Sequence, residues 1–267
     1  MAEIQILKVR SGSKLYGTDI PTSDEDWIEA FFDDDPRKAF CLGYDWHDSG
    51  SQTIADKGDT RRHDIRQFVH LASKGQTAFL ESVFADHKHF AVYQMTKCFF
   101  QYWPEFKANL PTSQMNLVGP ALGYASSEYK ATFGETTGKL GEQRQVELAK
   151  FGYSPKNAHH GIRILAQTLH CLRTGEYTPY PEKHKHGRIH MLWLPFLLDL
   201  KLGKVKESEV RSCFELLISE LEPYHVKQGD QVKKSPYPMT EFQARYGALN
   251  EATGQMLAQV WNDNELP

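Results

Sequence analysis

Two aspartates separated by one residue, Asp24 and Asp26, have the type and spacing that metal-dependent chemistry requires. On a strand, side chains two residues apart point to the same face, about 6.5–7 Å apart along the chain. Carboxylates this close repel each other unless a cation lies between them. A pair of divalent metal ions uses such carboxylates to hold a triphosphate and to activate an attacking oxygen. The alternative for an isolated pair is a solvated strand end or loop.

A turn at Gly12 and Ser13 precedes the aspartates and supplies what a triphosphate also needs. It offers unhindered backbone N–H groups and a hydroxyl, and a following helix N-terminus directs partial positive charge at an anion. We therefore expect Gly12, Ser13 and the adjacent Lys14 to bind nucleotide phosphates next to the metal site.

Short strands on either side are expected to position these residues. Runs of β-prone residues occupy 4–9 and 26–31, with a turn and a possible helical turn between them, and a third short strand is expected at 61–65. From Arg66 onward apolar residues recur at helical spacing. This pattern therefore predicts an α+β unit over residues 1–95.

Strand signals fade from Phe90 onward. Helices are predicted over 90–103, 157–174 and 208–221, separated by turns that contain Pro and Gly. The apolar run 191–200 predicts a further buried helical segment. Residues 96–267 are therefore predicted to be all helical.

The helix over 157–174 has the clearest pattern. Its apolar residues step by four and three and form one stripe, and Gly175 stands where a C-terminal cap belongs. The stripe consists of Ala158, Ile162, Leu165, Leu169 and Leu172. This stripe is expected to face the core of the helical region.

Polar residues of the same helix lie off that stripe and share one arc, with Lys156 one turn upstream. They are His159, His160, Arg163, Gln167 and His170. This arc could face a cleft between the two domains, and the family resemblance described below implies that Lys156, His160 and Arg163 do so and hold phosphates. The alternative is a hydrated helix face with surface salt bridges.

Composition limits the classes of protein that this chain can belong to. The chain is 40% hydrophobic and 24% charged, with a formal net charge of -3, which excludes a disordered chain and a generally basic surface that coats nucleic acid. The four cysteines, Cys41, Cys98, Cys171 and Cys213, form no CxxC pair and indicate reduced thiols. No apolar stretch approaches the length of a membrane span, so a cytoplasmic protein without membrane contact is expected.

Two further groups have both a functional and a structural interpretation. His184, His186 and His190 with Lys185 and Arg188 suggest a metal cluster, but residues of this composition more often meet phosphate or solvent. The aromatic residues Trp103, Tyr177, Tyr180 and Trp193 could stack on a base or belong to the core. The sequence leaves the second choice open.

The motif of the first 27 residues, GS-x-x-YG-x-x-x-x-x-SD-x-D, resembles the signature of the nucleotidyltransferase superfamily that includes DNA polymerase beta. It is most similar to the predicted nucleotidyltransferases of bacterial and phage genomes. Further blocks of that family follow in order at 64–84, 123–125, 151–165 and 172–176. The sequence departs from the family pattern at Gln67, Ser154 and Pro155, and from Lys227 onward no further block is recognised.

The resemblance implies an N-terminal minimal nucleotidyltransferase domain, like the polymerase beta palm, over 1–95 and a helical substrate-selecting domain over 96–267. It implies Mg²⁺ (or Mn²⁺) bound by Asp24 and Asp26, with an NTP as co-substrate. By position Asp64 corresponds to the third carboxylate of such sites, as metal ligand or general base. The alternative is that Asp64 caps the helix that begins near Arg66.

The resemblance leaves the acceptor open. Acceptors of this superfamily are RNA ends, protein side chains and small molecules, and the net charge of -3 mildly disfavours a long nucleic acid. Transfer of a nucleoside monophosphate to an acceptor hydroxyl, with release of pyrophosphate, is the expected reaction. The alternatives are an RNA 3′-end nucleotidyltransferase and a non-catalytic nucleotide-binding protein that regulates or neutralises a toxin.

Overall fold

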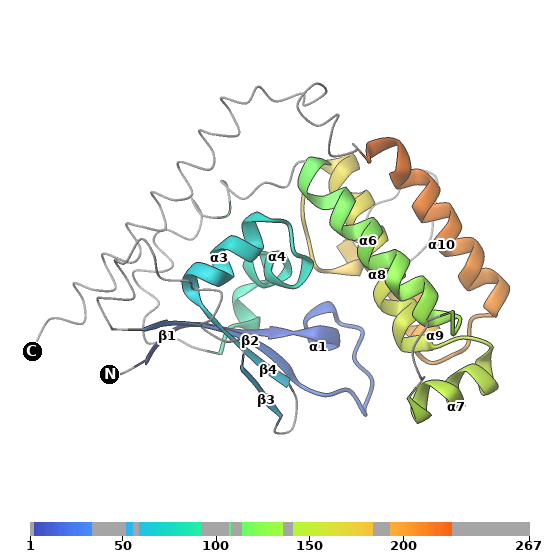
Figure 1. Cartoon of the computed structure of the whole chain (residues 1–267), viewed down its shortest axis with the longest axis horizontal. Helices are drawn as coiled ribbons and strands as arrows, with labels where there is room; N and C mark the ends of the chain where they lie inside the picture. Colours follow the sequence, from blue (N-terminus) through green and yellow to red (C-terminus); the bar gives the residue numbers. More distant parts are fainter. Residues whose placement is uncertain are drawn as a thin grey trace, which may run out of the picture. The chain divides into compact units, whose positions relative to one another are not determined.

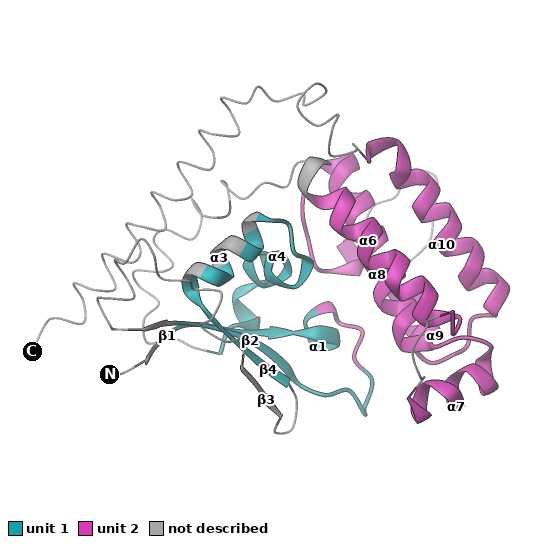
Figure 2. Cartoon of the chain, viewed as in Figure 1, with its two compact units in different colours: residues 1–15, 20–111, 235–267 teal, residues 16–19, 112–234 magenta. Residues whose placement is uncertain are grey.

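A computed structural model describes residues 3–33, 52–55, 59–91, 107, 114–135, 141–183 and 193–225 (Figure 1). The chain divides into two compact units (Figure 2). The first unit comprises Met1–Leu15, Ile20–Pro111 and Ser235–Pro267, and the second comprises Tyr16–Asp19 and Thr112–Lys234. The described residues mix strands and helices, which agrees with the predicted α+β class. The boundary predicted at residue 95 lies outside the described residues and stays a prediction.

The first unit contains a four-stranded sheet with the order β1-β2-β4-β3. The strands are β1 (Glu3–Ser11), β2 (Asp26–Asp33), β3 (Gln52–Ala55) and β4 (Asp59–Asp64). β1 pairs antiparallel with β2, β2 parallel with β4, and β3 antiparallel with β4. The three predicted strands are confirmed as β1, β2 and β4, whereas β3 was not predicted.

Apolar alternation sets the register between β1 and β2. Val9 lies opposite Ile28, and Leu7 lies opposite Ala30. All four side chains are buried. A slip of one residue would turn these side chains to the other face of the sheet, so the buried pairs hold the register. The same register brings the end of β1 next to the beginning of β2.

Helices cover one face of this sheet. After the short helix α1 (Gly12–Tyr16) come α3 (Ile65–Ser73), α4 (Thr77–Phe84) and the 3-10 turn η2 (His87–His89). α3 packs against β2 and β4, and α4 packs against β1 (Figure 1). Their fully buried apolar side chains are Ile65, Phe68, Ala72, Leu80 and Val83. The helical spacing predicted from Arg66 onward is confirmed.

The second unit is helical in the residues that the structure describes. Its helices are α6 (Gln114–Thr132), α7 (Glu142–Phe151), α8 (Pro155–Thr174), α9 (Trp193–Lys201) and α10 (Glu207–Leu221), with 3-10 turns η3 (Pro181–Lys183) and η4 (Glu222–Tyr224). α8 packs against α6, α9 and α10. It is therefore the central helix of this unit.

The sequence pattern correctly predicts the C-terminal end and the apolar face of α8, whereas the helix begins two residues before the predicted start at residue 157. Pro155 begins the helix, where its missing N–H is tolerated. Gly175 ends it in the left-handed conformation, φ 74°, and its N–H donates to the carbonyl of Cys171 at 2.8 Å. The stripe lies in the helical core, where Leu172 is partly buried and the other members are fully buried.

Other helix predictions have mixed outcomes. The segments predicted at 191–200 and 208–221 are confirmed as α9 and α10. The helix predicted over 90–103 lies outside the described residues, except Phe90 and Ala91, where Phe90 forms an isolated bridge with Val9. α6 and α7 were not predicted. None of the described helices combines the length and the apolarity that crossing a membrane requires.

We expect Leu165→Ala to lower the free energy of unfolding by about 2–5 kcal/mol, because it opens a cavity beside the central helix. The matched control is Leu216→Ala, whose side chain on α10 is 45% exposed. The control should change stability by no more than about 0.5 kcal/mol. Urea unfolding of both variants checks this, and equal losses would contradict the central place of α8.

Candidate active site

The carboxylate of Asp26 lies directly against Gly12. The β1–β2 register pairs Ser11 with Asp26, so the residue after β1 faces the beginning of β2. A Cβ placed on Gly12 would overlap Oδ2 of Asp26, and Gly12 has a φ of 64°, which only glycine adopts readily. Position 12 therefore requires glycine for two independent reasons. Gly12, predicted to bind phosphate, and Asp26, predicted to bind metal, are therefore adjacent, and both roles stay predictions.

Asp24 does not lie on the strand, which corrects the expectation that both aspartates share a strand face. β2 begins at Asp26, and Asp24 is an exposed residue in the segment before it. That segment is closed by a local hydrogen-bonded turn. Ser23 N–H donates to the carbonyl of Ile20 at 2.8 Å, and Ile20 N–H donates to Oγ of Ser23 at 2.9 Å. The turn positions the backbone immediately before Asp24.

The residue between the two aspartates, Glu25, is held by two cations. Its carboxylate is 2.8 Å from the guanidinium of Arg10 and 3.9 Å from Nζ of Lys14. Partly exposed pairs of this kind contribute little to stability. Their effect here is geometric, because they anchor the backbone that joins Asp24 to Asp26. Lys14, predicted to bind phosphates, lies beside the metal-ligand candidates through this contact.

Asp64 is not brought to this group. In the parallel β2–β4 pair Asp64 lies opposite Phe31, five residues from Asp26, or about 16 Å along the strands. The side chain of Asp64 is buried, and it directly precedes α3, where a helix cap belongs. The strand register therefore does not place Asp64 beside Asp26.

Asp59 is the acidic residue that parallel pairing places beside Asp26. It is exposed and begins β4, and its backbone N–H lies 3.4 Å from Oδ1 of Asp26. The sequence analysis did not identify Asp59, because Asp59 and Asp64 lie on the same short strand and the sequence does not show which of them pairs beside Asp26. The sequence did contain a signal for Asp59. Asp26 begins its strand, so a residue that lies beside it on a parallel strand is expected at the beginning of that strand as well.

The donor chemistry of this group fits a metal that arrives with a nucleotide. Mg²⁺ prefers oxygen ligands and commonly takes one or two carboxylates together with substrate phosphates. Asp24 and Asp26 supply carboxylate oxygens, and Asp59 is adjacent to Asp26. Within the described ranges, no three His, Cys, Asp or Glu side chains are placed to hold an ion by themselves. The group therefore suits a metal–triphosphate complex rather than a structural metal.

The polar arc of α8 is buried except for His160, which is partly exposed, so the alternative of a hydrated helix face is wrong for the other four residues. His159, Arg163, Gln167 and His170 are each at most 2% exposed. The guanidinium of Arg163 lies over the ring of Tyr16, 3.6 Å from its centroid, and donates to Oε1 of Gln167 at 3.0 Å. All these residues belong to the second unit. Arg163 is thus fixed by two contacts.

Two histidines of this arc, His159 and His160, have pKa values below the ordinary value, which favours their neutral forms. Burial first, and then the cations Arg163, Lys156 and Lys201, lower the pKa of His160 to about 3. Burial, His160, Arg163 and Lys201 lower the pKa of His159 well below its ordinary value. Lys156 is exposed at the start of the helix. A position of Lys156, His160 and Arg163 opposite Asp24 and Asp26 stays a prediction.

The other candidate residues have structural roles wherever the structure describes them. Tyr177, Tyr180 and Trp193 are buried, which confirms the core interpretation for these three rings. Trp103 and the basic segment 184–190 lie outside the described residues. Burial raises the pKa of Cys171 to about 11 and of Cys213 to about 12, so neither thiol is an activated nucleophile.

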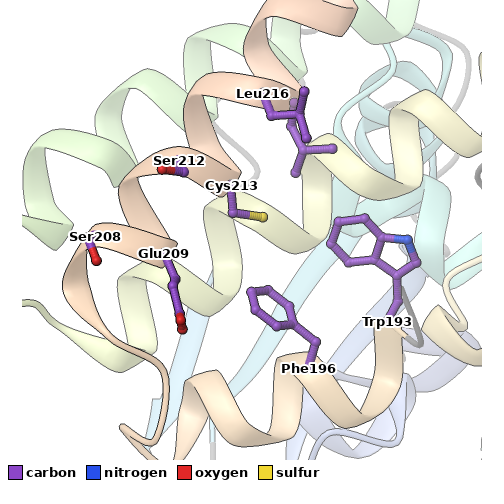
Figure 3. A pocket seen from close by; sticks show the side chains of 8 residues that line it. Trp193, Phe196, Ser208, Glu209, Ser212, Cys213 and Leu216 are labelled. Carbon is purple, nitrogen blue, oxygen red and sulfur yellow. The ribbon is translucent and has the colours of Figure 1, made fainter. Parts of the chain in front are cut away.

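A pocket of about 480 Å³ lies between α9 and α10 (Figure 3). Trp193 and Phe196 line one side, and the α10 side chains Ser208, Glu209, Ser212, Cys213, Leu216 and Leu217 line the other. None of the predicted site residues lines this pocket. It is therefore distinct from the group around Asp26.

Comparison with known proteins supports the family resemblance that the motif indicated. The sequence model of one family, described as the RNA repair pathway DNA polymerase beta family, matches residues 3–242. The matched range includes all the predicted site residues and continues past Lys227, where the sequence blocks end. It confirms the resemblance to polymerase beta-like nucleotidyltransferases. No curated protein and no solved structure matches the chain.

Gly12→Ala should destabilise the protein more than Gly17→Ala does. Both glycines have a φ near 70° and flank α1, so either alanine incurs about 1–2 kcal/mol of backbone strain. Only Gly12 is crowded, by Asp26, whereas nothing lies within 4 Å of a Cβ at Gly17. We expect an additional loss of at least about 1 kcal/mol at Gly12 in urea unfolding. Equal losses of unfolding free energy in the two variants would mean that Asp26 can move away from position 12 without destabilising the protein.

Replacement of His160 by Gln should flatten the pH dependence of stability. The folded pKa is about 3 and the ordinary value is 6.5, so below pH 6.5 the unfolded chain binds a proton that the folded chain does not. The folded state therefore loses stability as the pH falls toward 3, by up to about 1.4 kcal/mol per pH unit from this residue. Urea midpoints between pH 7.5 and 4.5 measure the slope. Replacement of the exposed His225 is the control, and an unchanged slope in His160→Gln would refute the assignment.

Proposed function

Because the chain belongs to the RNA repair pathway DNA polymerase beta family, we propose that it is a metal-dependent nucleotidyltransferase. It moves a nucleoside monophosphate from an NTP to an acceptor hydroxyl and releases pyrophosphate. The observation that carries this proposal is the contact between the Gly12 turn and the carboxylate of Asp26. A phosphate bound at the Gly12 turn would lie next to the Asp26 carboxylate, and the two negative charges would repel each other. A cation bound by both the phosphate and the carboxylate would remove this repulsion.

A metal–triphosphate complex meets that requirement. The backbone and the hydroxyl at Ser13 suit phosphate oxygens, while Asp24 and Asp26 would hold Mg²⁺ (or Mn²⁺). When bound, such a metal activates the attacking oxygen and offsets charge on the phosphates. Ser13 and Lys14 then orient the triphosphate, and the ion pairs of Glu25 hold the two aspartates in place.

Asp59 takes the place of the third carboxylate in this proposal. It stands beside Asp26 on the neighbouring parallel strand, whereas Asp64 lies five residues farther along. A third carboxylate at this position either adds a metal ligand or accepts the proton of the attacking hydroxyl. Asp64 is assigned the alternative role of capping α3.

Side chains of α8 contribute electrostatic stabilisation in this proposal. Lys156 and Arg163 carry positive charge, and a neutral His160 can donate one hydrogen bond to a phosphate oxygen. Stacking on Tyr16 and the hydrogen bond to Gln167 hold the Arg163 guanidinium in a defined orientation. Fixed donors of this kind stabilise charge that develops in a transition state.

The acceptor that we favour is an RNA end. The family description names an RNA repair pathway, which supports RNA over a protein side chain or a small molecule. The net charge of -3 requires that any RNA contact come from a local basic surface. The non-catalytic alternative is disfavoured because the turn and the carboxylates of a working site are all present.

The deciding experiment incubates the protein with each α-labelled NTP, Mg²⁺ and a total lysate, and then separates labelled RNA, protein and small molecules. Asp24→Asn, Asp26→Asn and Asp59→Asn should each abolish labelling, because neutral amides bind the metal weakly. Asp64→Asn is the matched control on the same strand as Asp59 and should retain at least about one-tenth of the wild-type rate.

Each outcome separates one part of the proposal from the rest. Turnover above about one-tenth of wild type in both Asp24→Asn and Asp26→Asn would refute the metal assignment. Loss of activity in Asp64→Asn with full activity in Asp59→Asn would restore Asp64 as the third carboxylate. Circular dichroism and urea unfolding confirm that each variant is folded before its rate is compared.

A further inference from the structure

Two cations of the second unit hold the short segment Tyr16–Asp19. Arg163, on α8, stacks on Tyr16 at 3.6 Å from the ring centroid. Lys201, at the end of α9, donates from Nζ to the carbonyl of Thr18 at 3.0 Å. Thr18 is fully buried, and Arg163 is 2% exposed. Two positively charged side chains and a hydroxyl are therefore gathered around one short stretch of backbone.

Three polar groups in this region make no hydrogen bond with any residue that the structure describes. They are Oγ1 of Thr18, Nε2 of His159 and Nε2 of Gln167, on side chains that are at most 2% exposed. The amide of Gln167 has a defined orientation, because its Oε1 accepts from the guanidinium of Arg163 and its NH₂ group points elsewhere. Buried polar groups of this kind are unfavourable unless a ligand or water satisfies them.

Apart from the exposed Asp19, the side chains gathered here can donate hydrogen bonds, and the charged ones among them are positive. A hydroxyl, an imidazole N–H, a guanidinium and an ammonium offer donors to one ligand. Burial, followed by His160 and by the cations Arg163 and Lys201, lowers the pKa of His159, and no carboxylate is among these causes. The complementary ligand is therefore an anion that offers several acceptor oxygens.

We propose that Thr18, His159, Arg163 and Lys201 form a binding site for a phosphate group, with Gln167 orienting the Arg163 guanidinium. A tetrahedral phosphate presents more acceptor oxygens than a carboxylate and suits donors that approach from α8, α9 and the segment around Thr18. The site rests on residues of the second unit alone. Only the source of the phosphate, an NTP or a phosphorylated acceptor, rests on the proposed function.

Inorganic pyrophosphate is the probe for this site. It is titrated into the full chain in buffer with EDTA, and binding is followed by calorimetry and by the ring signals of His159 in NMR spectra. Lys201→Gln and Thr18→Val should each weaken binding about tenfold or more. Lys204→Gln is the matched control, because Lys204 is an exposed lysine three residues after Lys201 and pairs with Asp199 at 3.3 Å. The control should bind pyrophosphate like the wild type.

Thr18→Val also separates binding from folding. Removing a buried hydroxyl without a partner should raise Tm in the absence of pyrophosphate while binding is weakened. A variant that lowers Tm and binds pyrophosphate normally would overturn the proposal. So would a Lys201→Gln variant whose Kd lies within about twofold of the wild-type value.

Competition identifies the source of the phosphate. ATP and an RNA oligonucleotide with a 5′-phosphate are compared with the same oligonucleotide bearing a 5′-hydroxyl. Displacement of pyrophosphate by ATP alone assigns the site to the NTP, and displacement that requires the 5′-phosphate assigns it to the acceptor. Binding that depends on Lys201 and survives in Asp26→Asn supports this site even if the transfer assay is negative. Binding that is lost in Asp26→Asn places the pyrophosphate at the Gly12 turn and overturns the inference.

Discussion

The close approach of the Asp26 carboxylate to Gly12 is the constraint on which the rest of the active-site geometry depends. A side chain at position 12 would overlap the Asp26 carboxylate, so only glycine allows the two segments to approach this closely. The approach is set by strand register, because pairing of Ser11 with Asp26 leaves Gly12 as the next residue. Register in turn follows from buried pairs farther along the strands, such as Val9 with Ile28. Core packing thus determines the spacing of groups that are themselves outside the core.

Local patterns in the sequence predicted the elements that carry the site, because their signals are contained within a few residues. The alternation of 4–9 and 26–31 is visible without knowing which strands pair. The apolar stripe and the cap of α8 are likewise visible within one helix. α6 was missed for a related reason, because Gly119, Pro120 and Gly123 are typical of turns, and only packing against α8 makes that segment a helix.

Two features of the candidate site depend on contacts between segments that are far apart in the sequence, and the sequence alone did not predict them. The choice between Asp59 and Asp64 depends on which residue of β4 lies beside Asp26, and parallel pairing gives that place to Asp59. Burial of the polar arc of α8 is non-local in the same sense. A helical wheel separates apolar from polar positions, but whether other parts of the protein cover the polar side depends on segments far away in the sequence.

The buried arc also changes how Arg163 can act. A guanidinium buried without compensation is unfavourable, and the Tyr16 ring and the Gln167 carbonyl oxygen together provide that compensation. Stacking occupies the flat face of the guanidinium and leaves its edge donors in the plane, of which one reaches Gln167. Tyr16 is the last residue of α1, so the stack holds the point at which the chain enters the second unit. Arg163 therefore has a structural role within that unit, in addition to any charge that it offers to a phosphate.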